Sequence, residues 1–132
     1  MQCFEAPAQP DCLDELHAAL DRLWREAPDV QEPARMRFST AVSEVLGNVV
    51  VHGRTGEGAI ATVRVSLKAE PGALRAELLD DGIALAPGAA VTELPEDDLA
   101  ESGRGLALAR AALDELHYVR DGGNRWELVI RR

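Results

Sequence analysis

The chain has 132 residues and a formal net charge of −9, a length that suits one domain of ordinary size. Hydrophobic residues make up 46% and charged residues 28% of it, which excludes the composition of a disordered segment. Because 23 acidic residues stand against 14 basic ones, the overall field repels nucleic acid and anionic membranes, and we expect neither as a partner. We therefore predict a single domain over residues 1–132.

The amino-terminal segment has neither the basic region nor the apolar region of a targeting signal, and no apolar run approaches the roughly 20 residues that span a bilayer. Cys3 and Cys12 lie close together near the N-terminus. A disulfide between them would close only a short loop, and they lack the partners that a zinc site needs. The sequence thus predicts a soluble, reduced, cytoplasmic protein.

Two helices are predicted first. An apolar stripe at helical spacing follows Asp11, which can cap the helix, and this helix ends near Pro28. Pro33 suits the first turn of a second helix, which we expect from about residue 33 to 52, where Gly53 stops it. The apolar stripes consist of Leu13, Leu16, Leu20, Leu23 and Trp24 in the first helix, and of Phe38, Val42, Val45 and Val49 in the second.

Alternation of apolar and polar residues then predicts strands over 61–68 and 74–78, joined by a turn at Pro71-Gly72 into an antiparallel hairpin. Residues 82–102 show no period and predict a long functional loop. A third helix is expected after Gly105, with an apolar side that includes Leu106, Ala109, Leu113 and Leu116, and a last strand carries Trp126, Leu128 and Ile130. Each strand has one polar face, so the predicted fold is α/β: a two-layer α/β sandwich with a mainly antiparallel sheet and three helices on one face.

The predicted second helix carries Glu44, Asn48 and His52 at spacings of four, which places a carboxylate, an amide and an imidazole on one stripe roughly 12 Å long. A solvated polar stripe, common on amphipathic helices, is the alternative explanation. Apolar neighbours nearly surround the stripe and favour a less open setting: Ala41, Val45, Leu46, Val49, Val50 and Val51. An Asn amide oxygen is a suitable ligand for a Mg²⁺ ion that also binds phosphate.

Two glycine-containing motifs follow. Asp80-Asp81-Gly82 ends a predicted strand, where an ordinary strand exit with turn-forming residues is the alternative. Gly103-Arg104-Gly105 opens a predicted helix, where free backbone N–H groups, the helix dipole and the Arg104 charge favour an anion site. A simple hinge before the helix is the alternative for that motif.

Together, the three motifs resemble those of the Bergerat-fold ATPases, the group that includes DNA gyrase, MutL and the two-component histidine kinases. Residues 44–52 resemble the N box, Asp80-Asp81-Gly82-Ile83-Ala84 the G1 box, and residues 103–109 the G2 box. The resemblance covers nearly the whole chain, including an N-terminal strand and a closing hairpin. The short form is most similar to the serine/threonine kinases that act as bacterial anti-sigma factors.

By this resemblance, Asn48 would hold the Mg²⁺ that bridges the phosphates of ATP, and Glu44 would orient or deprotonate the attacking hydroxyl. Asp80 would accept a hydrogen bond from the adenine amino group, and Gly82 would let the base approach the backbone. The β and γ phosphates would lie in a cradle formed by Gly103, Arg104 and Gly105, beneath an ATP lid at about residues 85–102. The three boxes also place His52, Ala84 and Leu106 among the nucleotide-binding residues.

Two positions depart from the family pattern. The G1 box usually ends in Gly, but here Ala84 stands there, so the turn lacks a residue free to adopt positive φ. The last hairpin of the family often has a Thr near the nucleotide, whereas this chain reads Gly123-Asn124-Arg125-Trp126.

The resemblance implies an ATP-dependent protein serine/threonine kinase that regulates transcription as an anti-sigma factor in partner switching. Its expected partners are a sigma factor and an anti-anti-sigma antagonist protein that it phosphorylates, with a homodimer common among such kinases. A non-catalytic switch that binds ATP or ADP and a regulatory partner is the alternative, which the two departures keep open. A detached ATPase domain of a histidine kinase is a third hypothesis. Outside the motifs, we interpret His17 as a surface residue and His117 as a cation at a helix C-terminus.

Overall fold

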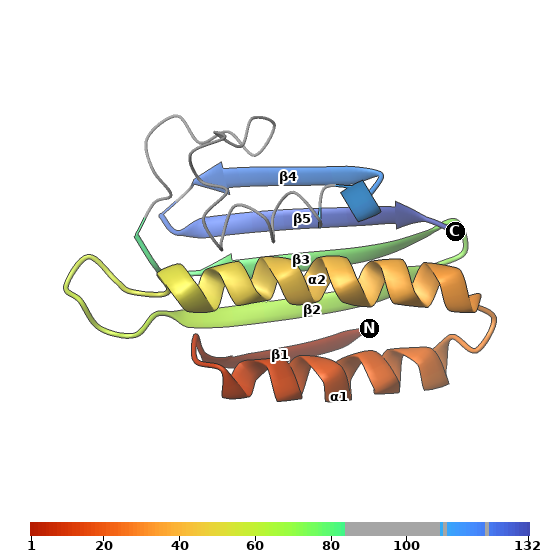
Figure 1. Cartoon of the computed structure of the whole chain (residues 1–132), viewed down its shortest axis with the longest axis horizontal. Coiled ribbons are helices and arrows are strands. Elements are labelled where there is room, and N and C mark those ends of the chain that lie inside the picture. Colours follow the sequence, from red (N-terminus) through yellow and green to blue (C-terminus); the bar gives the residue numbers. More distant parts are fainter. Residues whose placement is uncertain (84–108, 110, 121) are drawn as a thin grey trace.

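The computed structural model describes residues 1–83, 109, 111–120 and 122–132. One five-stranded sheet carries two helices on the same face (Figure 1). Its strands run in the order β1-β2-β3-β5-β4, and all neighbours are antiparallel. The elements are β1 (Gln2–Pro7), α1 (Asp11–Glu26), α2 (Glu32–His52), β2 (Thr62–Glu70), β3 (Ala73–Asp80), β4 (Glu115–Arg120) and β5 (Asn124–Arg131).

The structure confirms the two-layer α/β class, the β2–β3 hairpin and the first two helices. It also contains the N-terminal strand and the closing hairpin that the family resemblance implies. Most of the predicted third helix falls outside the described residues, so two helices are counted where three were expected. Ala109, Ala111 and Ala112 are helical. In the described part of the chain, no helix combines the length and the apolar character needed to cross a membrane.

The expected capping role of Asp11 is wrong. The N-cap of α1 is Pro10, and no side chain caps the helix. Backbone carbonyls do this work, because the N–H of Cys12 donates to Gln9 at 2.9 Å and the N–H of Leu13 donates to Pro10 at 3.1 Å. Asp11 instead lies in the first turn, where its negative charge complements the helix dipole.

The core lies between the helices and the alternate residues of the strands that face them. Phe38 of α2 is fully buried and meets the Trp24 ring edge-on at 6.1 Å. Each such large apolar side chain contributes roughly 1.5–3 kcal/mol on burial. The largest fully buried side chains are Trp126, Phe38, Leu16, Leu23, Leu46, Leu67, Leu74, Leu78, Leu128 and Ile130. In β3 and β5 this inward register also determines where the polar residues at the strand ends point.

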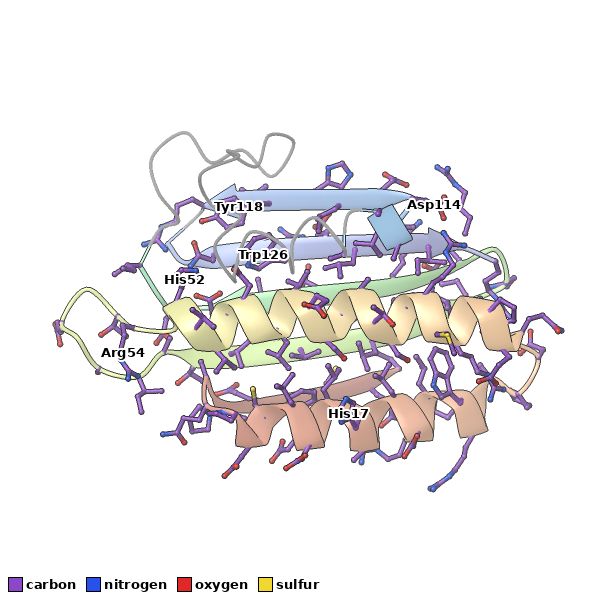
Figure 2. All side chains as sticks on the ribbon, in the orientation of Figure 1. His17, His52, Arg54, Asp114, Tyr118 and Trp126 are labelled. Atoms are coloured by element: carbon purple, nitrogen blue, oxygen red, sulfur yellow. The ribbon has the colours of Figure 1, made fainter. Side chains whose placement is uncertain are left out.

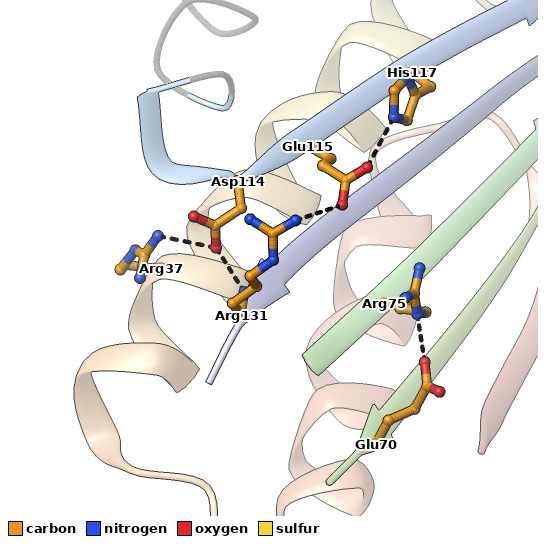
Figure 3. Close-up of polar contacts among 7 residues, drawn as sticks. All are labelled: Arg37, Glu70, Arg75, Asp114, Glu115, His117 and Arg131. Carbon is orange, nitrogen blue, oxygen red and sulfur yellow. Dashed lines mark hydrogen bonds and ion pairs between the residues drawn. The ribbon is translucent and has the colours of Figure 1, made fainter. Parts of the chain in front are cut away.

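The helical prediction fails at the segment that leads into β4. Leu116, expected on a helix, lies in β4 opposite Leu128 of β5. The last helical residue is Ala112, and two residues later the N–H of Asp114 donates to the carbonyl of Val129 at 2.9 Å. The Asp114 carboxylate accepts the N–H of Arg131 at 2.6 Å and pairs with Arg37 of α2 at 3.8 Å (Figure 3). The strand β4 begins directly after this bend, because β5 provides the neighbouring strand with which it pairs.

His117 is consequently a strand residue and not a cation at the end of a helix. Its imidazole lies 3.2 Å from the Glu115 carboxylate, which also pairs with Arg131 at 3.4 Å (Figure 3). These are exposed contacts on the face of the sheet away from the helices, and pairs of this kind contribute little to stability.

Candidate functional site

The polar stripe of α2 lies where the helix passes over the ends of the central strands. Asn48 is buried, with 5% of its surface exposed, whereas Glu44 is half-buried and His52 is exposed. The flanking Val45 and Val49 are buried in the core, which draws Asn48 inward with them. Its side-chain amide makes no hydrogen bond to another described residue. A buried amide indicates either a hydrogen-bond network or a ligand.

Asp80 ends β3 on the inward face of the sheet. It continues the register of Leu74, Ala76 and Leu78, and 8% of its surface is exposed. Its Oδ1 accepts two hydrogen bonds, from the N–H of Gly82 and from Nδ2 of Asn124, both at 2.9 Å. Among the described residues, no donor reaches Oδ2. Among these residues, Asp80 therefore has one oxygen that accepts two hydrogen bonds and one that accepts none.

The pKa of the Asp80 carboxyl is raised from its ordinary value. Burial is the main cause, because it disfavours the charged form. The hydrogen bonds from Asn124 and Gly82 act in the opposite direction, since they stabilise the carboxylate. The neighbouring Asp81 raises the pKa further, and the Arg120 guanidinium lowers it.

Asn48 and Asp80 line one narrow hollow, although they are 32 positions apart in the sequence. The hollow lies between α2 and the ends of β3 and β5, and its lining residues are Asn48, Val49, His52, Asp80, Ile83, Asn124 and Trp126. Figure 2 labels two of them, His52 at the end of α2 and Trp126 on β5. The hollow thus joins an amide, a carboxylate and an apolar wall.

Gly82 is needed for a close approach within the protein. A Cβ atom there would lie 2.8 Å from Asp80 Oδ1 and 3.3 Å from the carbonyl oxygen of Arg54. The first contact would require the Asp80 carboxylate to move, and the second would require the Arg54 carbonyl to shift by a few tenths of an ångström. The glycine therefore allows the Asp80 carboxylate to fold back onto the turn that follows β3.

All four backbone polar groups of the turn at Gly82 and Ile83 are hydrogen-bonded. The N–H of Gly82 donates to Asp80, and its carbonyl accepts from Arg120 at 2.6 Å. The N–H of Ile83 donates to the carbonyl of Arg54 at 2.8 Å, and its own carbonyl accepts from Asn124 at 2.9 Å. Bonds from β3, β4, β5 and the segment after α2 thereby fix this turn.

The profile of the histidine kinase-like ATPase domain matches residues 6–131, nearly the whole chain. The chain belongs to this family. Among curated proteins, no sequence matches it significantly. The family assignment agrees with the fold, with its antiparallel sheet and helices on one face.

Solved structures show the same fold. The blue-light activated histidine kinase of Erythrobacter litoralis EL346 is 25% identical, with a TM-score of 0.60, over 77% of this chain and 31% of that one. A structure of the RsbU and RsbW domains of Rv1364c from Mycobacterium tuberculosis is 21% identical, with a TM-score of 0.63, over 99% of this chain and 32% of that one. The SiaB-SiaC complex from Pseudomonas aeruginosa is 19% identical, with a TM-score of 0.53, over 100% and 90%. The chain thus spans about a third of the first and second of these relatives.

The site residues predicted from the sequence separate into three groups. Asn48, His52 and Asp80 come together around the hollow, with Gly82 in the turn beside it. Glu44 lies one helical turn before Asn48 and does not line the hollow. The others fall outside the described residues: Ala84, Gly103, Arg104, Gly105, Leu106 and the expected lid at 85–102.

Sequence reasoning gave no role to three residues of this ATPase domain: Tyr118 and Arg120 both contact Asn124, which contacts Asp80. Asn124 is buried, with 7% exposed, and is the register partner of Asp80. A signal for it was present, because positions 124, 126, 128 and 130 share the inward face of β5 and the first of them is polar. A polar residue at an inward position of a strand indicates either a hydrogen-bond network or a ligand.

The residues present fit a magnesium ion that is held mainly by phosphate. Within residues 1–83 and the other described positions, no group of three or more His, Cys, Asp or Glu side chains could enclose a metal. Mg²⁺ commonly takes one or two protein oxygens and completes its shell with water and substrate phosphate. The Asn48 amide oxygen suits that role, since the residue lines the hollow and its amide has no partner among the described side chains.

Proposed function

We propose that this domain binds Mg·ATP in the hollow between α2 and the ends of β3 and β5. We further propose that it transfers the γ-phosphate to a serine or threonine of a small antagonist protein. This transfer would control its binding of a sigma factor. The observation that carries the proposal is the convergence of two buried polar side chains, Asn48 and Asp80, on one hollow. Membership of the histidine kinase-like ATPase family supports it.

Each residue of the hollow has a distinct role in this proposal. Asn48 would hold the ion, and Oδ2 of Asp80 would accept the amino group of adenine. Guanine carries a carbonyl at that position, so a carboxylate acceptor there favours adenine over guanine. When bound, Mg·ATP supplies the phosphoryl group, and the protein contributes positioning and charge neutralisation.

Glu44 is the residue proposed to act on the substrate hydroxyl. It lies one turn from Asn48 on the same helix and is half-buried. A carboxylate there would orient the hydroxyl and accept its proton, a contribution of typically ~10²–10⁴ in rate.

A partner protein is part of the proposal because of two of the solved structures that the chain resembles. One of these holds RsbU and RsbW domains, and another is a SiaB-SiaC complex. The sigma factor, the antagonist and a homodimer all belong to the proposal.

A non-catalytic nucleotide switch is the second candidate. It is favoured by the position of Glu44, which does not line the hollow with Asn48 and Asp80. In this alternative, ATP or ADP would change the affinity for a partner and no phosphate would be transferred.

Titration calorimetry with ATP, ADP and GTP tests nucleotide binding. We expect heat with ATP and ADP in the presence of Mg²⁺ and little with GTP. Asn48→Ala should weaken Mg·ATP binding, whereas Thr40→Ala, an exposed position two turns earlier on α2, should leave it unchanged. Absence of heat and of any thermal shift at millimolar ATP would contradict the proposal.

A transfer assay separates the kinase from the switch. Partners are captured from the native host and incubated with the domain and labelled ATP. Glu44→Gln should bind ATP and partner normally but lose nearly all transfer. If wild type labels no partner while nucleotide still changes its affinity for one, the switch is the better description. Full transfer by Glu44→Gln would exclude the role given to this carboxylate.

A further inference from the structure

A group of three side chains from the β4–β5 hairpin surrounds the turn that follows Asp80. Asn124 is at its centre, with Tyr118 and Arg120 on β4 as its neighbours. The ring of Tyr118 packs on Trp126, with 4.7 Å between the ring centroids (Figure 2). None of these three residues lies in the N, G1 or G2 box, although Asn124 belongs to the last hairpin, where the family often has a Thr.

The hydrogen-bonding capacity of the Asn124 side chain is fully used. Nδ2 donates to Asp80 Oδ1 and to the carbonyl of Ile83, both at 2.9 Å. Oδ1 accepts from the hydroxyl of Tyr118 and from Arg120 at 3.2 Å. An amide has two N–H donors and two acceptor lone pairs, so none remains for a ligand. Asn124 therefore cannot bind a base directly without giving up one of these bonds.

The neighbours also determine which way the amide points. The carbonyl of Ile83 can only accept a hydrogen bond, so it must face the NH₂ group. The guanidinium of Arg120 can only donate, so it must face the oxygen. With the amide in this orientation, the NH₂ group also faces Asp80 and provides a donor to Oδ1 of the carboxylate.

We propose that Asn124 is the positioning residue of the base site. It holds Asp80 and the Gly82–Ile83 turn so that Oδ2 of Asp80 is the acceptor presented to the 6-amino group of a purine. Tyr118 and Arg120 act through Asn124 by fixing its amide. This inference rests on the proposed nucleotide site and adds the residue that positions its purine-selecting carboxylate.

Substitution of Asn124 by Thr or Val gives a matched pair of nearly equal shape. The Thr side chain keeps a hydrogen-bond donor on the side that faces Asp80, whereas Val has none. The probes are ATP and ITP, which differ at the 6-position of the purine. We expect Asn124→Val to weaken ATP binding about 10- to 100-fold and ITP binding much less. Asn124→Thr should restore most of the preference for ATP.

The ratio of the two affinities distinguishes positioning from a structural role. A substitution that only loosens the fold would weaken ATP and ITP alike and leave the ratio unchanged. That result in Asn124→Val, with the fold intact by circular dichroism, would overturn the inference. So would an equal ratio in Asn124→Val and Asn124→Thr.

A second measurement needs no nucleotide. The ¹³C carboxyl signal of Asp80 is followed against pH in the free protein. Other charged or titratable groups near Asp80 are Asp81 in its own turn, Arg120 on β4 and His52 on α2. Asn124→Val should move the midpoint to higher pH, because the carboxylate loses a donor, and Asn124→Thr should move it less.

The two measurements separate the two hypotheses. If wild type binds neither ATP nor ITP but the midpoint moves as expected, the nucleotide site is wrong and the positioning of Asp80 by Asn124 holds. If ATP binds to wild type but neither the ratio nor the midpoint changes in Asn124→Val, the nucleotide site holds and Asn124 has no positioning role.

Discussion

Asp80 and Asn124 lie directly opposite each other at the ends of β3 and β5, and an amide–carboxylate hydrogen bond of 2.9 Å joins them. The sheet register alone brings these residues together, since 44 positions separate them in the chain. The same register places both side chains on the face covered by α2, where Asn48 is buried. The candidate site is therefore built where three separate elements end.

Gly123 allows the β4–β5 turn to pack against the end of β3. A Cβ atom at this position would overlap the carbonyl oxygen of Asp80. Gly123→Ala should therefore lower the free energy of unfolding by about 1–3 kcal/mol, measured by urea denaturation. Gly72→Ala is the matched control in the β2–β3 turn, because nothing lies within 4 Å of its Cβ position and its φ is not positive. A similar loss in both variants would show that the contact with Asp80 is not the cause.

The spacing of hydrophobic residues along the chain was sufficient to predict most of the helices and strands. The stripe of α1 and the alternation in β2, β3 and β5 each point to one structure only. The segment before β5 is different, because Leu113 and Leu116 fit a helix while Leu116 and Tyr118 fit a strand. Pairing of Leu116 with Leu128 and of Tyr118 with Trp126 decides between them. The tertiary fold brings the partner strand β5 into place, so the local sequence of this segment does not predict the pairing.

The candidate site was only partly predictable for a related reason. Asn48 and Asp80 lie in local motifs whose residue types and spacing indicate their chemistry. Asn124 lies in none of the three boxes, and its importance depends on the register that sets it opposite Asp80. Arg120 likewise reaches the carbonyl of Gly82 only because β4 pairs with β5.

Gly47 lies inside α2, where glycine lowers helix stability. Its Cβ position is open, with nothing within 4 Å. Gly47→Ala should therefore raise the free energy of unfolding by about 0.5–1 kcal/mol, because alanine restricts the unfolded chain without a clash. Gly53→Ala provides the contrast at the end of the same helix, since its Cβ would lie 2.6 Å from the carbonyl oxygen of Val49. Thermal unfolding of both variants should give shifts of opposite sign.

The two cysteines should differ strongly in reactivity. Both are free, but Cys3 is exposed on β1 and Cys12 is buried in the first turn of α1. Burial also raises the pKa of the Cys12 thiol, which lowers the fraction of reactive thiolate. A disulfide reagent should modify one thiol rapidly and the second only as the protein unfolds. Cys3→Ser should abolish the fast phase; a fast phase that persists in this variant would contradict the burial of Cys12.

Asp80→Asn tests two effects of the buried Asp80 charge separately: its cost to folding stability and its role in nucleotide binding. The amide oxygen can still accept the bonds from Gly82 and Asn124, while an NH₂ group replaces Oδ2. Because burial raises the pKa of Asp80 in the folded state, the folded protein binds a proton before the unfolded chain does as pH falls. Wild type therefore gains stability relative to the variant as pH falls through that raised pKa towards the ordinary value.

The difference in unfolding free energy, variant minus wild type, should thus be most positive near neutral pH and shrink on acidification. Urea denaturation of both proteins at a series of pH values measures it, and the subtraction cancels the other titrating groups. Nucleotide binding should change in the opposite sense, because the variant presents a donor where adenine needs an acceptor. We expect its ATP affinity to fall about 10- to 100-fold while its ITP affinity holds or rises. A stability difference that grows on acidification would show that the Asp80 charge is not disfavoured in the folded protein.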